Sequence, residues 1–492
     1  MIHRVCAAIA LMIVYAAAAR PAGAEEASDA TNGAKDAASA LQAMEIGIPR
    51  DGPAIRAPRL TQADILSGAF SLKDLRRRGL EMFTTSFNRY DGYGDGTVGP
   101  DPAEFGQRPT VNGTWLRLNG LDSQTCQECH AFVSLATVPP TLGIAGVAGI
   151  ANTAMPFVTR IDVADEDGSL RAEVNGRLIN PPFLYGAGGV EQLGKEMTRD
   201  LQALKAQAQS QPGTPVQLVS KSVQFGSLSY SAAGGFDTSL VQGVDADLVV
   251  RPFGRKGEFA TVRAFDVGAL QFHMGMQAQE MVGVGVDDDE DGVVDEVLVG
   301  ELSAMHIFGT TLERPVQVMA NHATVRAGRQ VFDATGCGGC HVPELYTESR
   351  MLPIAFPEVE TDPDANVFYT IDLAARAPGF ARRGAGVSVP LHSDLKRHDM
   401  GPDLAETTGS GLDPFFITPR LWGIADTAPY LHDGRALTLR EAIEAHGGEG
   451  LEAAERFILL SDTQQNQLLV YLDSLRTPDR PAKGIDTPQR RY

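Results

Sequence analysis

Apolar residues recur at helical spacing only in short segments of this chain, and long stretches without clear periodicity separate those segments. The last segment is easy to place, because Ser461 and Gln464 have the spacing of a capping box at the start of a helix. The apolar positions that follow form a stripe on one face of that helix: Leu468, Leu469, Leu472 and Leu475. Residues 220–253 instead alternate polar and apolar side chains, which predicts a small hairpin. The pattern predicts a mainly α-helical protein with long loops and a small β element.

The first residues have the three-part layout of a secretory signal peptide. A short basic start, Met1–Arg4, precedes the apolar run Val5–Ala19 and the small residues Ala22–Ala24. A membrane anchor is the alternative, but the run is shorter than the roughly 20 residues that span a bilayer. We expect residues 1–24 to be removed on export to the periplasm, and residues 25–57 to form a flexible leader. No later stretch is long and apolar enough to predict a membrane span.

The formal net charge is −20, and loss of Arg4 and Arg20 with the signal peptide makes it more negative. Such an acidic chain argues against nucleic acid or anionic lipid as a partner. It would attract a basic protein or a cation. Acidity that only keeps an exported protein soluble is the alternative.

The five cysteines give a sharper signal than the composition does. One belongs to the signal peptide, and the others form two C-x-x-C pairs that are each followed by a histidine: Cys126, Cys129 and His130, then Cys337, Cys340 and His341. In a C-x-x-C-H sequence the two thiols can each add to one vinyl group of a porphyrin, and the histidine can ligate the iron. Two copies that use every cysteine of the exported chain predict two covalent haems c, with the two histidines as proximal ligands.

Two redox dithiols or one four-cysteine zinc site are competing interpretations of the same cysteines. The histidine after each pair counts against both, and so does the separation of more than two hundred residues between the pairs. We therefore expect redox chemistry at two haems and a redox partner protein such as a basic cytochrome.

A weak internal repeat indicates that the two haem motifs lie in related domains. The spacing of Gly79 and Phe83 recurs in Gly328 and Phe332, just before the second cysteine pair. Further on, both halves carry Gly-Arg, then Thr-x-Arg, then a histidine, in the same order. We expect two cytochrome c-like haem domains and a polar tail, with these bounds: 58–316, 317–476 and 477–492.

The second axial ligand decides what each haem does, because a strong ligand gives an electron-transfer haem and an open position admits peroxide or oxygen. The repeat singles out His273 and His446, each about one domain length after its C-x-x-C-H sequence. We expect His446 to ligate the second haem, with a structural helix-end histidine or ligation by Met400 as alternatives. His273 is expected in the first haem pocket, as a ligand or as the catalytic group that moves peroxide protons. His432 lies in a turn-like segment that favours a structural hydrogen bond.

Two arginines that each follow a glycine, Arg255 and Arg435, are candidates for binding haem propionates. The guanidinium group offers a planar fork of donors that matches a carboxylate. Simple surface exposure is the alternative for both residues.

An acidic segment at residues 287–296 resembles a calcium loop, with carboxylates at the first, third and fifth positions and then a glycine. A leucine replaces the glutamate usual at the twelfth position, so Asp295 or Glu296 has to complete the coordination. The predicted ligands of the calcium ion are four aspartates: Asp287, Asp289, Asp291 and Asp295. A solvated acidic turn is the alternative.

Several segments of the chain resemble the di-haem oxidoreductases once called thiol oxidoreductases. More distantly, they resemble the bacterial di-haem cytochrome c peroxidases and the enzyme that matures methylamine dehydrogenase. The segments that carry this resemblance are HDMG at 398–401, TPRLWG at 418–423, YLHDGR at 430–435, HGG at 446–448, and two central ones at 243–253 and 273–277.

This resemblance implies a two-domain, mostly helical protein with calcium between two haems, one transferring electrons and the other reacting with peroxide. The peroxidases usually have methionine or tyrosine where this chain has His446, so histidine implies a lower-potential, bis-histidine site. They have a glutamate at the position of His273 and a tryptophan between the haems, where residues around Phe253 include none. We expect a periplasmic di-haem oxidoreductase whose electrons enter at the second haem. The alternatives are a pure electron carrier, and an oxidase or oxygenase that modifies an organic or protein substrate.

Overall fold

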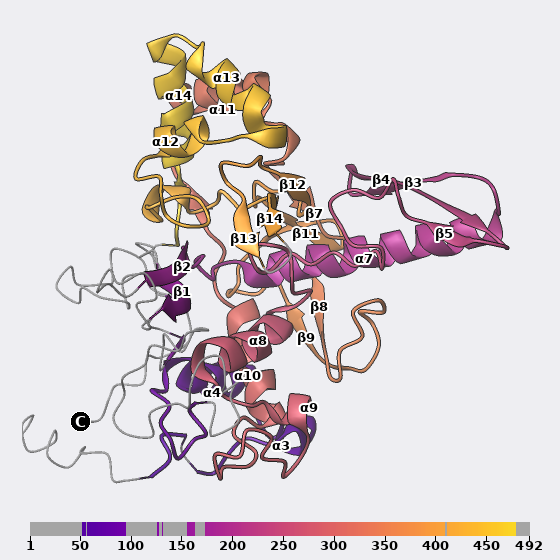
Figure 1. Ribbon diagram of the computed structural model, residues 1–492, viewed down its shortest axis with the longest axis vertical. Coiled ribbons are helices and arrows are strands. Elements are labelled where there is room, and N and C mark those ends of the chain that lie inside the picture. Colours follow the sequence, from indigo (N-terminus) through magenta and orange to yellow (C-terminus); the bar gives the residue numbers. More distant parts are fainter. Residues whose placement is uncertain are drawn as a thin grey trace, which may run out of the picture. The chain divides into compact units, whose positions relative to one another are not determined.

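The chain of this computed structural model combines helices with many short strands, nine of which follow one another within residues 345–417 (Figure 1). The structure describes residues 52–55, 57–94, 125–126, 130, 155–162, 173–408 and 411–478, with the backbone alone for 155–162, 173–179, 272, 407–408 and 411. The fold below is that of the compact unit Pro53–Ile485. The predicted signal peptide, nearly all of the leader and most of the tail lie outside the described residues.

The first helical group is built on two helices that touch closely. Helix α4 (Leu72–Thr84) begins with a capping box and packs against α10 (Val299–Thr310). A Cβ on Gly79 would lie 2.2 Å from the backbone oxygen of Ala304, so only glycine permits this approach. Helix α8 (Val262–Met274) packs on α10 as well, and so does the short α3 (Gln62–Leu66). The core of this group contains apolar side chains of α8 and α10: Leu270, Met274, Leu302 and Met305.

The second helical group repeats that arrangement. Helix α11 (Ala323–Thr335) packs along α14 (Asp462–Asp473), and a Cβ on Gly328 would lie 1.9 Å from the backbone oxygen of Gln467. Figure 1 shows α12 (Leu439–Glu444) and α13 (Leu451–Ile458) beside them. The core of this group is aromatic and aliphatic: Val325, Phe332, Phe457, Leu468 and Tyr471.

A third cluster of buried side chains surrounds the long helix α7 (Ala187–Ser210). Helix α7 packs on the three-stranded antiparallel sheet of β3 (Val216–Ser220), β4 (Val223–Ser231) and β5 (Gly235–Asp237). None of the helices in the described ranges combines the length and the apolar composition needed to cross a membrane.

The remaining strands form small sheets, most of them of two strands. Their bounds are β1 Met155–Asp162, β2 Glu173–Ile179, β6 Val316–Gln317, β7 Leu345–Tyr346, β8 Met351–Ala355, β9 Val367–Asp372, β10 Ala381–Arg383, β11 Gly386–Val389, β12 Arg397–Asp399, β13 Glu406–Thr408, β14 Gly411–Asp413, β15 Phe415–Ile417 and β16 Leu475–Arg476. Four short helical pieces complete the described part of the fold: α9 Gln279–Val282 and the 3₁₀ turns η2 Cys337–Gly339, η3 Ile424–Asp426 and η4 Gly448–Gly450.

The prediction of a mainly helical protein is therefore correct in part. Helices form both groups that carry a haem motif, but the described residues also contain seven small sheets, so the fold is mixed. The predicted capping box is present at Ser461. The predicted stripe is wrong at Leu469, because Tyr471 is the residue that turns inward between Leu468 and Leu472, and Leu475 already belongs to β16.

Candidate haem sites

The second C-x-x-C-H sequence forms a tight turn at the end of α11. Gly336 ends that helix with a φ of +93°, a conformation that favours glycine, and the 3₁₀ turn Cys337–Gly339 follows directly. The backbone N–H of His341 then donates to the oxygen of Cys337 (3.0 Å). Both cysteines are free thiols and only partly buried. The turn thus presents two thiols and an imidazole on one short segment, as covalent haem attachment requires.

His341 has the backbone carbonyl of His392 at Nδ1, and the carbonyl of Pro419 is a second acceptor close enough to raise its pKa. Its Nδ1 lies 3.2 Å from the backbone oxygen of His392. A carbonyl can only accept, so Nδ1 carries the proton and the lone pair is on Nε2. Burial, helped by the proximity of His446, lowers the pKa of His341 to about 4. The ring is therefore neutral and has the tautomer that metal-ligating histidines adopt.

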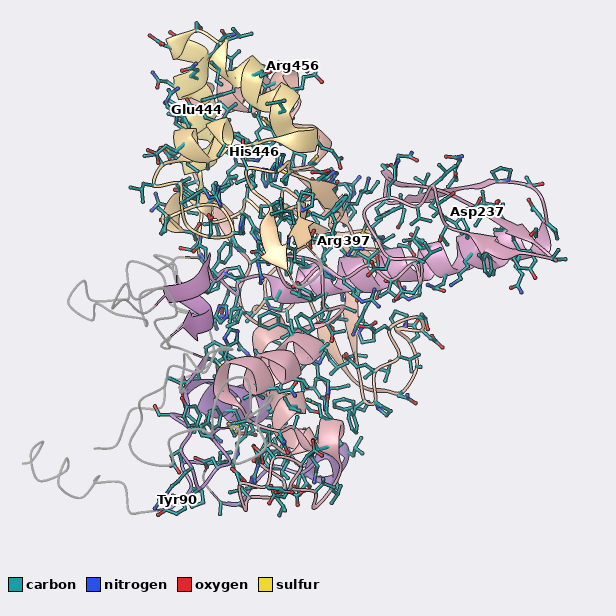
Figure 2. The ribbon with its side chains drawn as sticks, viewed as in Figure 1. Tyr90, Asp237, Arg397, Glu444, His446 and Arg456 are labelled. Carbon is teal, nitrogen blue, oxygen red and sulfur yellow. The ribbon has the colours of Figure 1, made fainter. Side chains whose placement is uncertain are left out.

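His446 lies close to His341. It follows α12, which ends at Glu444 (both labelled in Figure 2), and its Nδ1 lies 2.7 Å from the backbone oxygen of Ala442. Its Nε2 is therefore also the nitrogen with the lone pair, and burial lowers its pKa. The two ring centroids are 6.3 Å apart, with 64° between the ring planes.

This separation fits one metal ion between the rings. Imidazole–metal bonds are about 2 Å long and a ring centroid lies roughly 1 Å behind its nitrogen, so two axial histidines have centroids about 6 Å apart. The donor set also fits, because each ring donates its Nδ1 proton to a carbonyl and keeps Nε2 for the metal. The chain's own residues thus match a haem at Cys337 and Cys340 with two histidine ligands. The alternative ligand Met400 lies beside His446, since both side chains border Gly450.

The first C-x-x-C-H sequence repeats these contacts where the structure describes it. The backbone N–H of His130 donates to the oxygen of Cys126 (2.9 Å), and its Nδ1 lies 2.8 Å from the oxygen of Pro182. Phe265 of α8 meets the imidazole edge-on, with centroids 6.3 Å apart. His130 therefore has the same tautomer as His341, with Nε2 available. Cys129 lies outside the described residues.

His273 stands in the last turn of α8, close to His130. Burial lowers the pKa of His130 to about 4, the hydrogen bond to Pro182 opposes that shift, and the charge of His273 adds to it. The structure thus brings together the two histidines assigned to the first haem pocket. Ligation and proton transfer by His273 both stay predictions.

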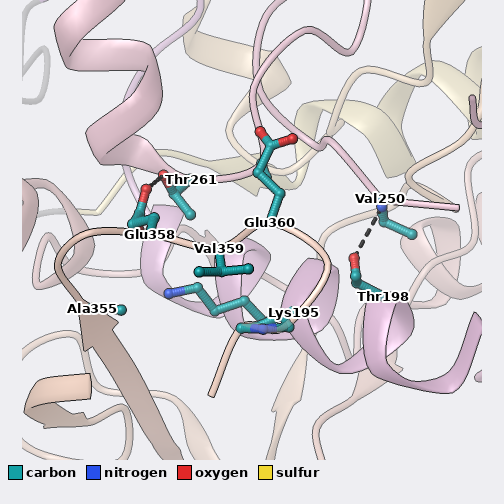
Figure 3. Close-up of a pocket in the computed structure, with 10 residues that line it drawn as sticks. Lys195, Thr198, Val250, Thr261, Ala355, Glu358, Val359 and Glu360 are labelled. Atoms are coloured by element: carbon teal, nitrogen blue, oxygen red, sulfur yellow. Dashed lines mark hydrogen bonds between the residues drawn. The ribbon is translucent and has the colours of Figure 1, made fainter. Parts of the chain in front are cut away.

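The start of α8 is fixed by a buried polar network. His306 Nε2 lies 2.9 Å from both carboxylate oxygens of Glu191, and Glu191 accepts a hydrogen bond from the first backbone N–H of α8 (3.0 Å). Thr261, the N-cap of α8, donates to Glu358 (2.5 Å) beside a small cavity that both line (Figure 3). The network holds the helix that carries His273, and it contains none of the residues predicted from the sequence.

The two arginines predicted to bind propionates already have carboxylate partners. Arg255 donates through Nε and Nη2 to both oxygens of Glu406 (2.6 and 2.9 Å). Arg435 donates through Nε to Asp433 (2.6 Å) and through Nη1 to the backbone oxygen of Asp403 (2.6 Å). These bonds use two of the five N–H donors of each guanidinium, and propionate binding by either arginine stays a prediction.

Arg420 is a candidate that the sequence analysis missed. Its Nη1 donates to the backbone oxygen of Pro252 (3.0 Å), and its guanidinium lies 5.9 Å from the ring centroid of Phe253. It makes no ion pair with any described residue, and burial lowers its pKa to about 10. The carbonyl of the preceding residue, Pro419, is close enough to His341 to influence its pKa. The sequence feature that could have identified Arg420 is its position in the TPRLWG segment, where it is the one basic residue.

Two further histidines have structural partners. His398 donates to Asp394 (2.9 Å) and Glu449 (2.7 Å). Burial opposes its charge, but the bonds to Asp394, to the Cys340 thiol and to Glu449 prevail and raise its pKa to about 11. His432 stacks on Phe416, with ring centroids 4.4 Å apart. A structural role for His432 was the interpretation that its turn-like segment favoured.

The acidic loop holds three of its four predicted ligands together, and the fourth prediction needs a correction. Carboxylate oxygens of Asp287, Asp289 and Asp291 lie within 4.8 Å of one another. Asp289 is buried, and its Oδ2 has no hydrogen-bond partner among the described residues. Asp295 turns away and accepts from Gln279 Nε2 (2.9 Å) and the backbone N–H of residue 285 (2.8 Å).

Glu296 is the carboxylate that turns toward the three aspartates. Its side chain is 2 % exposed, and after burial their negative charges are the main contribution that raises its pKa to about 9. It fits because residue 92 is a glycine, where a Cβ would lie 2.2 Å from the Glu296 side chain. Three grouped aspartates, one of them with an orphaned buried oxygen, suit an oxygen-ligated divalent ion such as calcium, and Glu296 is close enough to feel their charge.

Residues 380–475 match the model of a family described as "Di-haem oxidoreductase, putative peroxidase". The resemblance is confirmed over this segment. The segment contains His446 and Arg420, and it begins after the second C-x-x-C-H sequence.

A curated relative supports the same family. The chain is similar to "Cytochrome-c peroxidase IdrP2" of Denitromonas iodatirespirans, with 22% identity over 196 residues, which are 36% of this chain and 50% of that protein. The chain thus matches about half the length of this relative. A peroxidase-like di-haem oxidoreductase is therefore the class of protein to which this chain is related.

Two solved structures are similar at a low level. A MauG-like protein associated with microbial copper homeostasis is 12% identical over 61% of this chain and 91% of its own, with a TM-score of 0.27. Hydrazine synthase of Kuenenia stuttgartiensis is 14% identical over 43% of this chain and 61% of its own, with a TM-score of 0.25. Scores this low decide nothing about the fold.

Proposed function

We propose that this chain is an exported di-haem c-type cytochrome with peroxidase-like oxidoreductase activity. The observation that carries the proposal is the neighbouring pair His341 and His446, whose ring centroids are 6.3 Å apart and whose Nδ1 protons both go to carbonyls. The family match supports the di-haem class, and the two C-x-x-C-H sequences supply the means of covalent attachment.

The proposal gives each cysteine pair one haem. Cys337 and Cys340 form thioethers to one porphyrin, and Cys126 and Cys129 form them to the other. Haem c held in this way transfers electrons and, where an axial position is open, reacts with peroxide.

The two sites have different roles in this proposal. Two strong nitrogen ligands suit the site of His341 and His446 to electron transfer and leave no position for an oxidant. A haem held by His130 would supply the chemistry with the oxidant, and His273 would accept and return a proton there at one ring nitrogen. The neighbouring network of Glu191 and His306 keeps α8, and hence His273, in place.

Calcium, localisation and partner complete the proposal. Asp287, Asp289, Asp291 and Glu296 bind calcium, which offsets the repulsion among four carboxylates. Residues 1–24 direct export to the periplasm, and the acidic chain receives electrons from a basic redox protein.

A pure electron carrier is the second candidate, and a specific observation favours it. His273 lies close to His130, so it can also serve as a sixth ligand, which would leave both irons without an open position. Oxidation of an organic or protein substrate is a third candidate, which is compatible with the match to a di-haem oxidoreductase family.

The ferric absorption spectrum of the purified full chain separates the first two candidates. A high-spin component that shifts on addition of cyanide or peroxide supports the enzyme, and His273→Ala should then slow the reaction with peroxide while the high-spin component remains. Two low-spin haems that ignore both ligands support the carrier. A denatured, acid-extracted polypeptide without attached porphyrin mass would reject both.

A further inference from the structure

The carbonyl that orients His341 belongs to a residue in an unusual conformation. His392 has a φ of +57°, in the left-handed region that non-glycine residues seldom adopt. Its backbone oxygen receives the Nδ1 proton of His341 (3.2 Å). A conformation of this kind persists only where the surroundings hold it.

Every polar group of His392 is engaged. Its backbone N–H donates to Pro343 (3.3 Å), and its Nδ1 donates to the oxygen of Pro390 (3.1 Å). Because Nδ1 carries the proton, Nε2 can only accept, so the hydroxyl of Tyr471 donates to it (2.7 Å). His392 is 4 % exposed and Tyr471 is 2 % exposed.

Tyr471 is itself fixed from two sides of the second helical group. Arg329 of α11 donates to its hydroxyl oxygen (3.3 Å), and the ring of Phe332 packs against its ring with centroids 5.4 Å apart. Residue 328, one of its neighbours, is a glycine because a Cβ there would lie 2.7 Å from Cβ of Tyr471. The phenol therefore has a single orientation, and that orientation serves His392.

We propose that Tyr471 and His392 are positioning residues that hold the carbonyl behind His341 and thereby set the reduction potential of the iron bound at Cys337 and Cys340. This inference rests on the proposed function. A firm acceptor on Nδ1 makes the imidazole a stronger donor through Nε2, which favours the ferric state. Loosening the acceptor weakens that donation and favours the ferrous state.

The test is Tyr471→Phe in the full haem-loaded chain, which keeps the ring and removes the donor. We expect the ferrous-to-ferric ratio of the C-terminal haem at fixed potential to rise about tenfold, a positive shift of roughly 59 mV for one electron. The N-terminal haem should keep its potential and serve as the internal reference. Tyr230→Phe, which alters a tyrosine packed on Phe236 in the β3–β5 sheet, is the matched control and should shift neither haem.

His392→Asn is the second variant, since asparagine tolerates a positive φ but offers Tyr471 a different acceptor. A positive shift of the same haem in either folded variant, with low-spin spectrum and attached porphyrin retained, supports the inference. Wild-type potentials in the folded variants would overturn it, and so would failure of both to fold, because the pair would then be structural only. Absence of porphyrin from the wild-type chain would reject the proposed function instead, so the two failures are distinguishable.

Discussion

Removal of divalent cations should make the stability of this protein fall as the pH rises, because two buried carboxyls of the acidic loop resist ionisation. Glu296 is 2 % exposed and Asp289 is 6 % exposed. Burial and the neighbouring aspartates raise the pKa of Glu296 from 4.5 to about 9 and that of Asp289 from 3.8 to about 7.

The sign follows from which state ionises first. Below pH 4.5 Glu296 is protonated in both the folded and the unfolded chain, so it does not lower the free energy of unfolding. As the pH rises, the unfolded chain loses the proton first, and the free energy of unfolding falls until the folded carboxyl ionises near pH 9. One pKa unit corresponds to about 1.4 kcal/mol, so Glu296 alone costs on the order of 3 kcal/mol at pH 7. Calcium at a hundred times its dissociation constant would raise the free energy of unfolding by about 2.7 kcal/mol.

Urea unfolding at pH 5, 7 and 9, with chelator or with calcium, measures this effect. We expect calcium to stabilise more strongly at each higher pH. Glu296→Gln should flatten the pH dependence and weaken the response to calcium, whereas Asp295→Asn should retain that response, because Asp295 bonds to Gln279 and the loop backbone. Equal midpoints with chelator and with calcium at pH 9 would refute the reasoning, and so would calcium absent by elemental analysis.

Three further substitutions have definite expected outcomes. His446→Ala should convert the C-terminal haem to a high-spin ferric form visible in the absorption spectrum; an unchanged spectrum would point to Met400 as the ligand. Arg420→Gln should lower the potential of that haem by about 59 mV or less in a redox titration, because a positive charge is lost, and Arg435→Gln should change it less. Gly328→Ala should cost about 1–3 kcal/mol in urea unfolding, since its Cβ would collide with the carbonyl of Gln467; an unchanged midpoint would show that α11 and α14 separate easily.

Local signals in the sequence predicted local structure well. The capping box at Ser461 involves residues three positions apart, and its geometry needs no information from elsewhere in the chain. The face of the following helix was less certain, because Leu469 and Tyr471 both continue an apolar stripe. Packing against Phe332 selects Tyr471, and that contact joins residues far apart in the sequence.

The candidate haem and calcium sites likewise combine local features, which the sequence predicted, with long-range contacts, which it did not. The C-x-x-C-H turns are local, and the recurring Gly-Arg and Thr-x-Arg order predicted where His273 and His446 would stand. The roles of the neighbouring acidic and basic residues depend on contacts between distant parts of the chain, so local sequence patterns did not predict them. Glu296 rather than Asp295 turns inward because residue 92 leaves room for it, and Arg255 pairs with Glu406 across the chain. A sequence pattern gives the residue types at a site, but long-range packing decides which of them converge.

The two halves of the protein share a helix-contact glycine and a carbonyl acceptor for the haem histidine, but different residues provide that carbonyl. Each places a glycine where two helices touch, at Gly79 and Gly328, and each gives its haem histidine a carbonyl acceptor. In the first half that acceptor belongs to Pro182, whereas in the second it belongs to His392, whose side chain accepts from Tyr471. Substitution of Tyr471 can therefore loosen the carbonyl acceptor in the second half. Among the described contacts of the Pro182 carbonyl, no tyrosine hydroxyl plays the same part. The potentials of the two irons should consequently respond unequally to substitutions in the core of the second helical group, even though the histidines themselves make the same bond.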